Sequence, residues 1–187
     1  MSTATSLRAP ISGALCVLGL QPAGLADIRE GHALSTALIG PEIAGLDRLH
    51  EIQAWTGLSI FAFREEGRLT GVFAFLLLNW AGHAALLRDA FDGRAPDLSL
   101  VAHGHEHVSA YYGWAFAGST RPARTALVTG ADVLRRQVLT RLPFYCHAAT
   151  PAGRRAVTEK LGYFDIAGSP SGLLCALPDP AEQRRAA

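Results

Sequence analysis

Apolar residues recur along this chain at helical spacing in some stretches and at strand spacing in others. From Pro22, which suits the first turn of a helix, they recur every three or four positions over residues 22–39 and again over 41–57. The next stretch, LSIFAF (58–63) and LTGVFAFLLL (69–78), is rich in aromatic and β-branched residues, with a charged, glycine-containing segment between its halves. The pattern predicts two helices followed by a β-hairpin.

The remaining elements are shorter or less regular. Residues 14–20 predict a short strand before the first helix, and residues 98–118 predict one long strand, kinked or bulged near its glycines. The other predicted elements are a helix at 80–91, a helix from about Pro122, a strand at 143–149, a helix from Thr150 to Gly162, and a final pair of short strands. Alternating strands and helices require a parallel pair, whereas a hairpin is antiparallel. We therefore expect an α/β (α+β) fold, with a mixed central β-sheet and helices on both faces.

The length and composition suit one domain with an ordinary hydrophobic core. The chain has 187 residues, of which 49% are hydrophobic, and we expect a single domain at 12–177 with flexible ends at 1–11 and 178–187. A net charge of +1 gives no bulk attraction to nucleic acid or to an anionic membrane. The most apolar stretch, 71–87, contains polar residues and is too short for a membrane span.

The cysteines bear on location and on metal binding. Cys16, Cys146 and Cys175 are odd in number and widely spaced, which fits reduced thiols rather than a disulfide framework or a zinc site. We therefore expect a soluble cytoplasmic protein with no bound metal.

Two segments, together with the order of elements, resemble the GCN5-related N-acetyltransferase (GNAT) superfamily. Glu159-Lys-Leu-Gly-Tyr163 matches the Glu-Lys-Leu-Gly-Phe ending of a helix in many of those enzymes, where the glycine terminates the helix. Arg121-Pro-Ala-Arg-Thr-Ala126 has the spacing of the family's Arg/Gln-x-x-Gly-x-Gly/Ala loop, which binds the acyl-CoA pyrophosphate at a helix N-terminus. The sequence departs from the family at Arg124, where the loop has glycine, and at Thr158, where many members have a tyrosine that protonates the leaving thiolate.

The resemblance implies an acyl-CoA-dependent N-acyltransferase, with acetyl-CoA or another acyl-CoA as co-substrate. The acceptor would be an amine of a small molecule or a protein. The implied contacts are Arg121, Arg124, Thr125 and Ala126 with the pyrophosphate, and the backbone of Phe116 and Ala117 with the pantetheine arm. The two departures favour an alternative, a catalytically inactive GNAT-like module that binds a ligand or dimerises. The helix at 80–91 is extra relative to a minimal fold of the family and could cover the substrate side or form a homodimer contact.

Three histidines lie at alternate positions in the predicted long strand. In an extended strand, His103, His105 and His107 share one face, and we take His105 or His107 as the general base. A solvated face or interface is the alternative, and a metal-dependent enzyme built on this cluster is a third. The outer two side chains would be about 13 Å apart, too far for one metal ion without bending.

Two further segments are candidates for the site or for the core. Tyr112, Trp114 and Phe116 share a strand face, and could line a substrate slot or belong to the core. Cys146 and His147 are adjacent on a strand, so they point to opposite faces and do not form a nucleophile–base pair.

Overall fold

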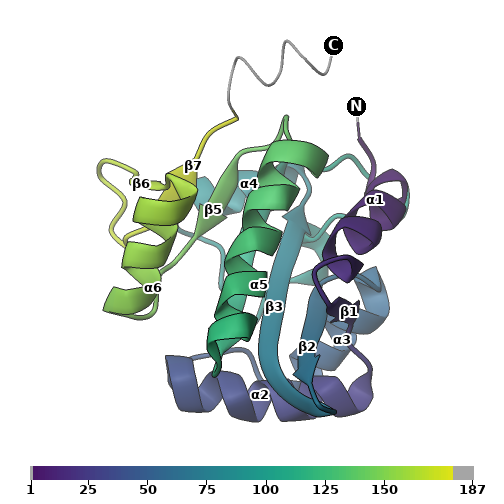
Figure 1. Cartoon of the computed structure of the whole chain (residues 1–187). Helices are drawn as coiled ribbons and strands as arrows, with labels where there is room; N and C mark the ends of the chain where they lie inside the picture. The colour runs from purple at the N-terminus through teal and green to yellow at the C-terminus, as the bar shows by residue number, and fades with distance from the viewer. Residues whose placement is uncertain (1, 179–187) are drawn as a thin grey trace.

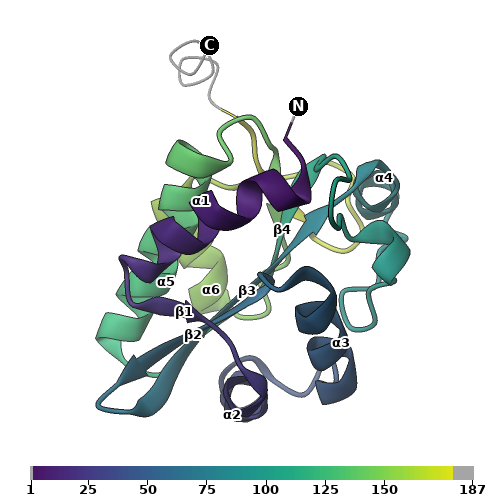
Figure 2. The same cartoon turned by 90° about the vertical axis from the view of Figure 1, so that its right-hand side faces the viewer.

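The computed structural model describes residues 2–178 as a central sheet covered by helices on both faces (Figures 1 and 2). The seven strands lie in the order β1-β2-β3-β4-β5-β7-β6. Among the strands of residues 2–178, only β4 and β5 pair in parallel, and every other neighbouring pair is antiparallel. The expected mixed sheet with helices on both faces is confirmed. The strands are β1 (Leu20–Pro22), β2 (Ile60–Glu65), β3 (Arg68–Leu78), β4 (Ala110–Gly118), β5 (Phe144–Cys146), β6 (Phe164–Asp165) and β7 (Leu174–Ala176).

The helices divide between the two faces of the sheet. Figure 2 shows α1, α5 and α6 on one side of β1–β4 and α2 and α3 on the other. The helices are α1 (Ala4–Cys16), α2 (Leu25–Ile39), α3 (Leu46–Thr56), α4 (Trp80–Leu87), α5 (Arg121–Val133) and α6 (Pro151–Arg155), with a 3-10 turn η1 (Leu98–Leu100) and π-helical turns η2 (Leu134–Val138) and η3 (Ala156–Lys160) that extend α5 and α6. Within residues 2–178, every helix is too short or too polar to cross a lipid bilayer.

The hairpin and the last helix agree with the sequence prediction because their local signals are strong. The two helices predicted from Pro22 and Pro41 begin later, at Leu25 and Leu46, and Pro22 belongs to β1. Glu66 and Gly67 both have positive φ, as a two-residue hairpin turn of the right twist requires. Thr150 caps α6 by accepting a hydrogen bond from the Gly153 amide, and Pro151 occupies the first turn. Gly162 follows with φ +69°, a conformation that favours glycine.

The strand predicted at 14–20 and the flexible end expected at 1–11 differ from the structure. Residues 4–16 form α1, whose side chains Leu7, Ile11 and Leu15 are buried. Thr3 caps the helix, and only residues 20–22 are strand. The part of the expected C-terminal end beyond residue 178 lies outside the described residues.

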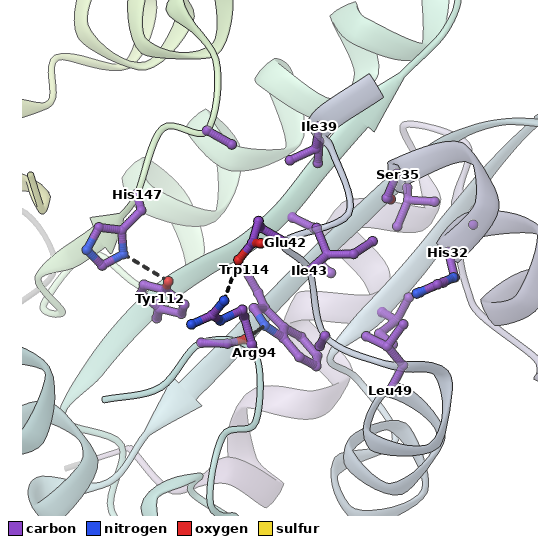
Figure 3. A pocket seen from close by; sticks show the side chains of 18 of the residues that line it. His32, Ser35, Ile39, Glu42, Ile43, Leu49, Arg94, Tyr112, Trp114 and His147 are labelled. Carbon is purple, nitrogen blue, oxygen red and sulfur yellow. Dashed lines mark hydrogen bonds and ion pairs between the residues drawn. The ribbon is translucent and has the colours of Figure 1, made fainter. Parts of the chain in front are cut away.

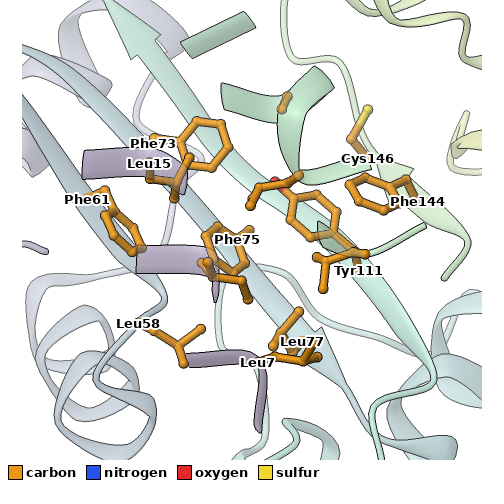
Figure 4. Packing of buried hydrophobic residues seen from close by; sticks show 14 of the residues in the cluster. Leu7, Leu15, Leu58, Phe61, Phe73, Phe75, Leu77, Tyr111, Phe144 and Cys146 are labelled. Carbon is orange, nitrogen blue, oxygen red and sulfur yellow. The ribbon is translucent and has the colours of Figure 1, made fainter. Parts of the chain in front are cut away.

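The main core lies between α1, α5 and the sheet (Figure 4). Phe61, Phe75 and Tyr111 stack in succession across β2, β3 and β4, with ring centroids 6.0 and 5.1 Å apart. Phe144 of β5 continues the row, 4.2 Å from Tyr111. This aromatic row fixes the position of β4 against β5, which is where the candidate site begins.

Candidate active site

The strands β4 and β5 are paired over three residues only. Tyr111–Gly113 lies beside Phe144–Cys146, and there β5 ends while β4 continues to Gly118. The edge of β4 beyond Gly113 therefore has no paired strand on the β5 side. Its backbone groups on that side are available to a ligand that carries amides.

A β-bulge lies in β4 at this point. Ala74 of β3 is opposite Ala115 and Phe75 is opposite Gly113, so Trp114 is an extra residue in the ladder. The bulge reverses the alternation of side chains. Trp114 lies on the same side of the sheet as Tyr112, whereas the Phe116 ring stacks on Phe73 in the main core, 4.5 Å away. The prediction that Phe116 shares a face with Tyr112 and Trp114 is therefore wrong.

A cavity of about 560 Å³ opens beside this bulge, on the α2 side of the sheet (Figure 3). This volume is within the range of small-molecule sites. Its apolar wall comes from α2, the α2–α3 segment, α3, β2 and β4. Large side chains of that wall are Ile28, Ile39, Ile43, Leu49, Ile60 and Trp114, and β3 adds Val72 and Ala74.

Three polar side chains at one end of the cavity form a hydrogen-bonded chain. The Tyr112 hydroxyl lies 3.0 Å from His147 Nδ1, and His147 Nε2 lies 3.0 Å from Ser171 Oγ. Tyr112 comes from β4, His147 directly follows β5, and Ser171 belongs to the turn before β7. All three line the cavity, and Figure 3 shows the imidazole directed at the phenol.

The surroundings of this chain set its protonation at neutral pH. Desolvation lowers the pKa of His147, while the charge of Asp89 acts in the opposite direction. Burial raises the pKa of Tyr112, with further contributions from Cys146 and Asp92. The imidazole is therefore neutral and the phenol protonated near pH 7. A neutral imidazole hydrogen-bonded at both nitrogens can accept a proton.

The outer rim of the cavity is formed by the segment 92–94. The Trp114 indole N–H donates to the Gly93 carbonyl oxygen, 2.6 Å away. Arg94 forms an ion pair with Glu42, which lies on the segment between α2 and α3. Figure 3 shows this ion pair as a dashed line next to the Trp114 side chain.

The loop that resembles the phosphate-binding motif begins α5. Arg121, Arg124 and Thr125 are exposed in its first turns, and Ala126 is buried. Thr120 caps the helix by accepting from the Ala123 amide, and Pro122 has no amide hydrogen to offer. Fewer backbone amides are therefore free to bind a phosphate than the family motif implies.

Side chains occupy part of this loop. Arg124 Nη1 donates to the carbonyl oxygens of Ser119 and Gly118, at 3.2 and 3.4 Å. Thr120 Oγ1 donates to the Glu65 carboxylate, which also accepts from Thr70 Oγ1 at 2.6 Å. The Arg124 guanidinium and the Glu65 carboxylate therefore occupy the two sides of this helix N-terminus.

The predicted histidine cluster is arranged differently from expectation. Residues 98–109 are not strand: β4 begins at Ala110, and Gly104 has φ +55°. His103, His105 and His107 therefore do not share a strand face, and they precede β4 while the α5 loop follows it. A nine-residue strand spans about 30 Å, so the cluster and the loop are far apart.

Each of these rings lies outside the cavity. The His103 ring is 4.2 Å from that of Trp55, and His107 Nδ1 lies 3.2 Å from the Ser2 carbonyl oxygen. His105 is exposed. In residues 2–178, no three His, Cys, Asp or Glu side chains converge as metal ligands would.

Thr158, at the position where many members of the family have a tyrosine, has a hydroxyl that is already hydrogen-bonded within its own helix. Thr158 Oγ1 donates to the Arg154 carbonyl oxygen of its own helix, at 2.9 Å. A hydroxyl committed to the preceding turn is a poor proton donor to a substrate.

Sequence reasoning missed His147 because its partners are distant in the chain. Tyr112 and Ser171 lie 35 and 24 positions away from it. Cys146 and His147 indeed do not act together, since the thiol is buried in the main core. The available signal was a histidine immediately after a strand that pairs in parallel with β4, because the carboxyl ends of such strands border ligand sites.

Comparison with known proteins finds likeness to solved structures only. No protein-family model matches the chain, and no curated protein matches it. A solved structure from Corynebacterium glutamicum, titled as histone acetyltransferase HPA2 and related acetyltransferase, is similar with 17% sequence identity and a TM-score of 0.49. The match covers 86% of this chain and 96% of that one.

Within residues 2–178, the strand order and the parallel pair β4–β5 agree with the mixed sheet that the sequence resemblance implied.

Proposed function

We propose that this protein is an acyl-CoA-dependent N-acyltransferase that moves an acetyl or longer acyl group to an amine of a small molecule or a protein. The observation that carries the proposal is the separation of β4 from β5 beside the bulge at Trp114, with a cavity of about 560 Å³ against it. A thioester entering between the strands would meet unpaired backbone on one side and an acceptor site on the other.

Backbone groups of β4 supply the polar contacts of this site. The free edge of β4 after Gly113 would pair with the amides of the pantetheine arm, including the backbone of Phe116 and Ala117. The extra residue of a bulge is left out of the ladder, so its N–H can point to the thioester oxygen. Such a preorganised donor stabilises the negative charge that develops there when an amine attacks.

The first test measures the diphosphate contact. Arg121, Arg124, Thr125 and Ala126 would hold the diphosphate, with the guanidinium groups in place of the family's glycine backbone. We expect Arg124→Ala to weaken binding of acetyl-CoA about 10-fold or more by calorimetry, since charge-assisted hydrogen bonds contribute about 1.5–3 kcal/mol. Arg29→Ala, an exposed arginine on α2, is the control. Equal affinity in both variants would contradict the assignment.

A non-catalytic GNAT-like ligand-binding module is the second candidate function. It is favoured by the Glu65 carboxylate at the Thr120 cap, which puts a negative charge where a diphosphate would approach. The two candidates differ in response to acyl-CoA. Ligand at 100 times its dissociation constant stabilises a folded protein by about 2.7 kcal/mol. Thermal unfolding that does not respond to acetyl-CoA or longer acyl-CoAs would favour this second function.

We further propose that the protein is cytoplasmic and that it can form a homodimer. All three cysteines are free thiols, as in a reducing cytoplasm. In α4, Trp80 and Leu87 are 76% and 54% exposed, which is consistent with the homodimer contact considered for this helix.

A further inference from the structure

The hydrogen-bonded chain Tyr112–His147–Ser171 is the group of titratable side chains that touches the cavity wall where β4 and β5 separate. It does not come from the motifs of the GNAT resemblance. Its three members come from segments that meet only in the folded chain, and the cavity contacts all of them. A hydrogen-bonded network at the end of a cavity, aimed at the point where a thioester would react, is placed for acid–base chemistry.

We propose that His147 is the general base of the acyl transfer, coupled to the acceptor through Tyr112, and that the acceptor is a primary amine on an apolar body. This inference rests on the proposed function, because it assigns the proton acceptor and the acceptor class of that reaction.

The wall of the cavity defines the body of the acceptor. Isoleucine and leucine side chains of α2 and α3 face the Trp114 indole across the cavity, so most of a bound molecule would contact apolar surface. Burial of this surface favours a ligand with an apolar body. An aromatic or aliphatic group of drug-like size fits this volume.

The charges around the cavity favour a cation. The carboxylates of Asp27, Glu42 and Asp92 line it, and the guanidinium groups beside them are those of Arg94 and Arg64. Three negative charges against two positive ones attract an ammonium group, which is the resting form of an aliphatic amine at neutral pH. The ammonium loses one proton to solvent before it can attack.

The neutral amine nitrogen attacks the thioester carbonyl carbon, the C–N bond forms, and the C–S bond breaks with its electron pair going to sulfur. As the nitrogen becomes positive, its proton moves to the Tyr112 oxygen while the phenol proton moves to His147 Nδ1. The phenol is regenerated and His147 becomes an imidazolium. That proton then passes by way of solvent to the thiolate, giving an amide and a free CoA thiol.

The charged neighbours of His147 fix the sign of the pH dependence. Asp89, beyond the end of α4, raises its pKa, whereas desolvation lowers it, and the net direction is downward. Asp92, Arg94 and Glu42 are the other charged groups on this side of the cavity. We therefore expect kcat/KM to fall on the acid side, with a midpoint below the 6.5 of an ordinary histidine.

The kinetic test follows thiol release from acetyl-CoA with 2-phenylethylamine as the probe acceptor, from pH 5 to 9. His147→Gln should lower kcat by about 100-fold or more, which is the usual contribution of a general base, and should remove the acid limb. Imidazole added to His147→Ala should restore part of the rate. His83→Gln is the matched control, because His83 Nε2 makes the same 3.0 Å contact with a tyrosine hydroxyl, that of Tyr145, outside the cavity.

A binding test separates failure of this inference from failure of the proposed function. In protein with labelled histidines, 2-phenylethylamine should shift the His147 ring resonances, and the neutral 2-phenylethanol should not. An active protein in which His147→Gln keeps its rate and pH profile overturns the base assignment. A protein without thiol release whose His147 resonances still respond to the amine retains the amine site and loses the transferase. If neither the rate nor the resonances respond, both are overturned.

Discussion

Two histidine–tyrosine pairs lie side by side in this protein and differ in what surrounds them. Tyr112 of β4 and Tyr145 of β5 are opposite each other in the parallel ladder, and each hydroxyl lies 3.0 Å from a histidine ring nitrogen. His147 lies at the cavity and continues to Ser171, whereas His83 projects from α4 and neither it nor Tyr145 lines the cavity.

The local chemistry of the two pairs is nearly the same. Desolvation lowers the pKa of both histidines and raises that of both tyrosines, for Tyr145 to about 12. What separates them is access to a ligand and a second partner on the far nitrogen. A shifted pKa indicates a functional site only when the titrating group can also reach a bound ligand.

The largest difference in reaction rate between the two pairs should appear when each tyrosine hydroxyl is removed in turn. Tyr112→Phe interrupts the proposed route from the amine to His147, so kcat/KM in the thiol-release assay should fall about 10- to 100-fold. Tyr145→Phe should stay within about twofold of the parent rate. Both variants should lose about 1 kcal/mol of unfolding free energy in urea, because each leaves a histidine without its partner. Equal loss of rate in both would mean that the hydroxyls act through stability alone.

The next effect concerns the rim, which exists only beside His147. Arg94→Ala breaks the ion pair with Glu42 and loosens the segment that accepts the Trp114 hydrogen bond. We expect KM for 2-phenylethylamine to change several-fold with little change in the affinity for acetyl-CoA. Arg48→Ala, which breaks the exposed pair with Glu51 on α3, is the control. An effect on acetyl-CoA affinity instead would assign the rim to the other substrate.

The smallest effect is on the pH dependence of stability. Both histidines have folded-state pKa values below the unfolded value of 6.5, so the unfolded chain binds more protons as the pH falls below it. Stability is therefore full above that pH and is lost as the pH falls through the folded-state values. Replacing either histidine by glutamine should flatten this loss by less than about 1 kcal/mol, since both rings are partly exposed and screened. Urea unfolding at pH 7 and pH 5 measures it, and an unchanged slope in both variants would contradict the prediction.

The sequence correctly predicted the elements that are bounded by recognisable turn and helix-capping residues. The turn at Glu66-Gly67 and the cap at Thr150 act within a few residues, so their structures agree with the prediction. It missed α1, in which apolar side chains recur at residues 4, 7, 11 and 15 but Pro10 interrupts the pattern. At 103–107 the alternating histidines imitated a strand, although Gly104 takes a conformation that breaks one.

The candidate site was less accessible to prediction than the fold. The stretch from Phe116 to Ala126 follows β4 into α5 as expected, because a strand, an N-cap and a helix are consecutive there. His147 meets Tyr112 and Ser171 only because β5 is placed between β4 and β7. Sheet order is a long-range property that no short window of residues encodes.

The extra residue at Trp114 also constrains how this protein can change through insertion and deletion. Before Trp114, the odd-numbered residue Tyr111 faces the aromatic core, whereas after Trp114 the even-numbered residue Phe116 does so. Deleting Trp114 would give a regular ladder in which Phe116 still faces Phe73, but it would remove the bulge beside the cavity, whereas a same-length replacement would keep the bulge. Variants of this strand that persist should therefore differ in residue type and keep their residue count.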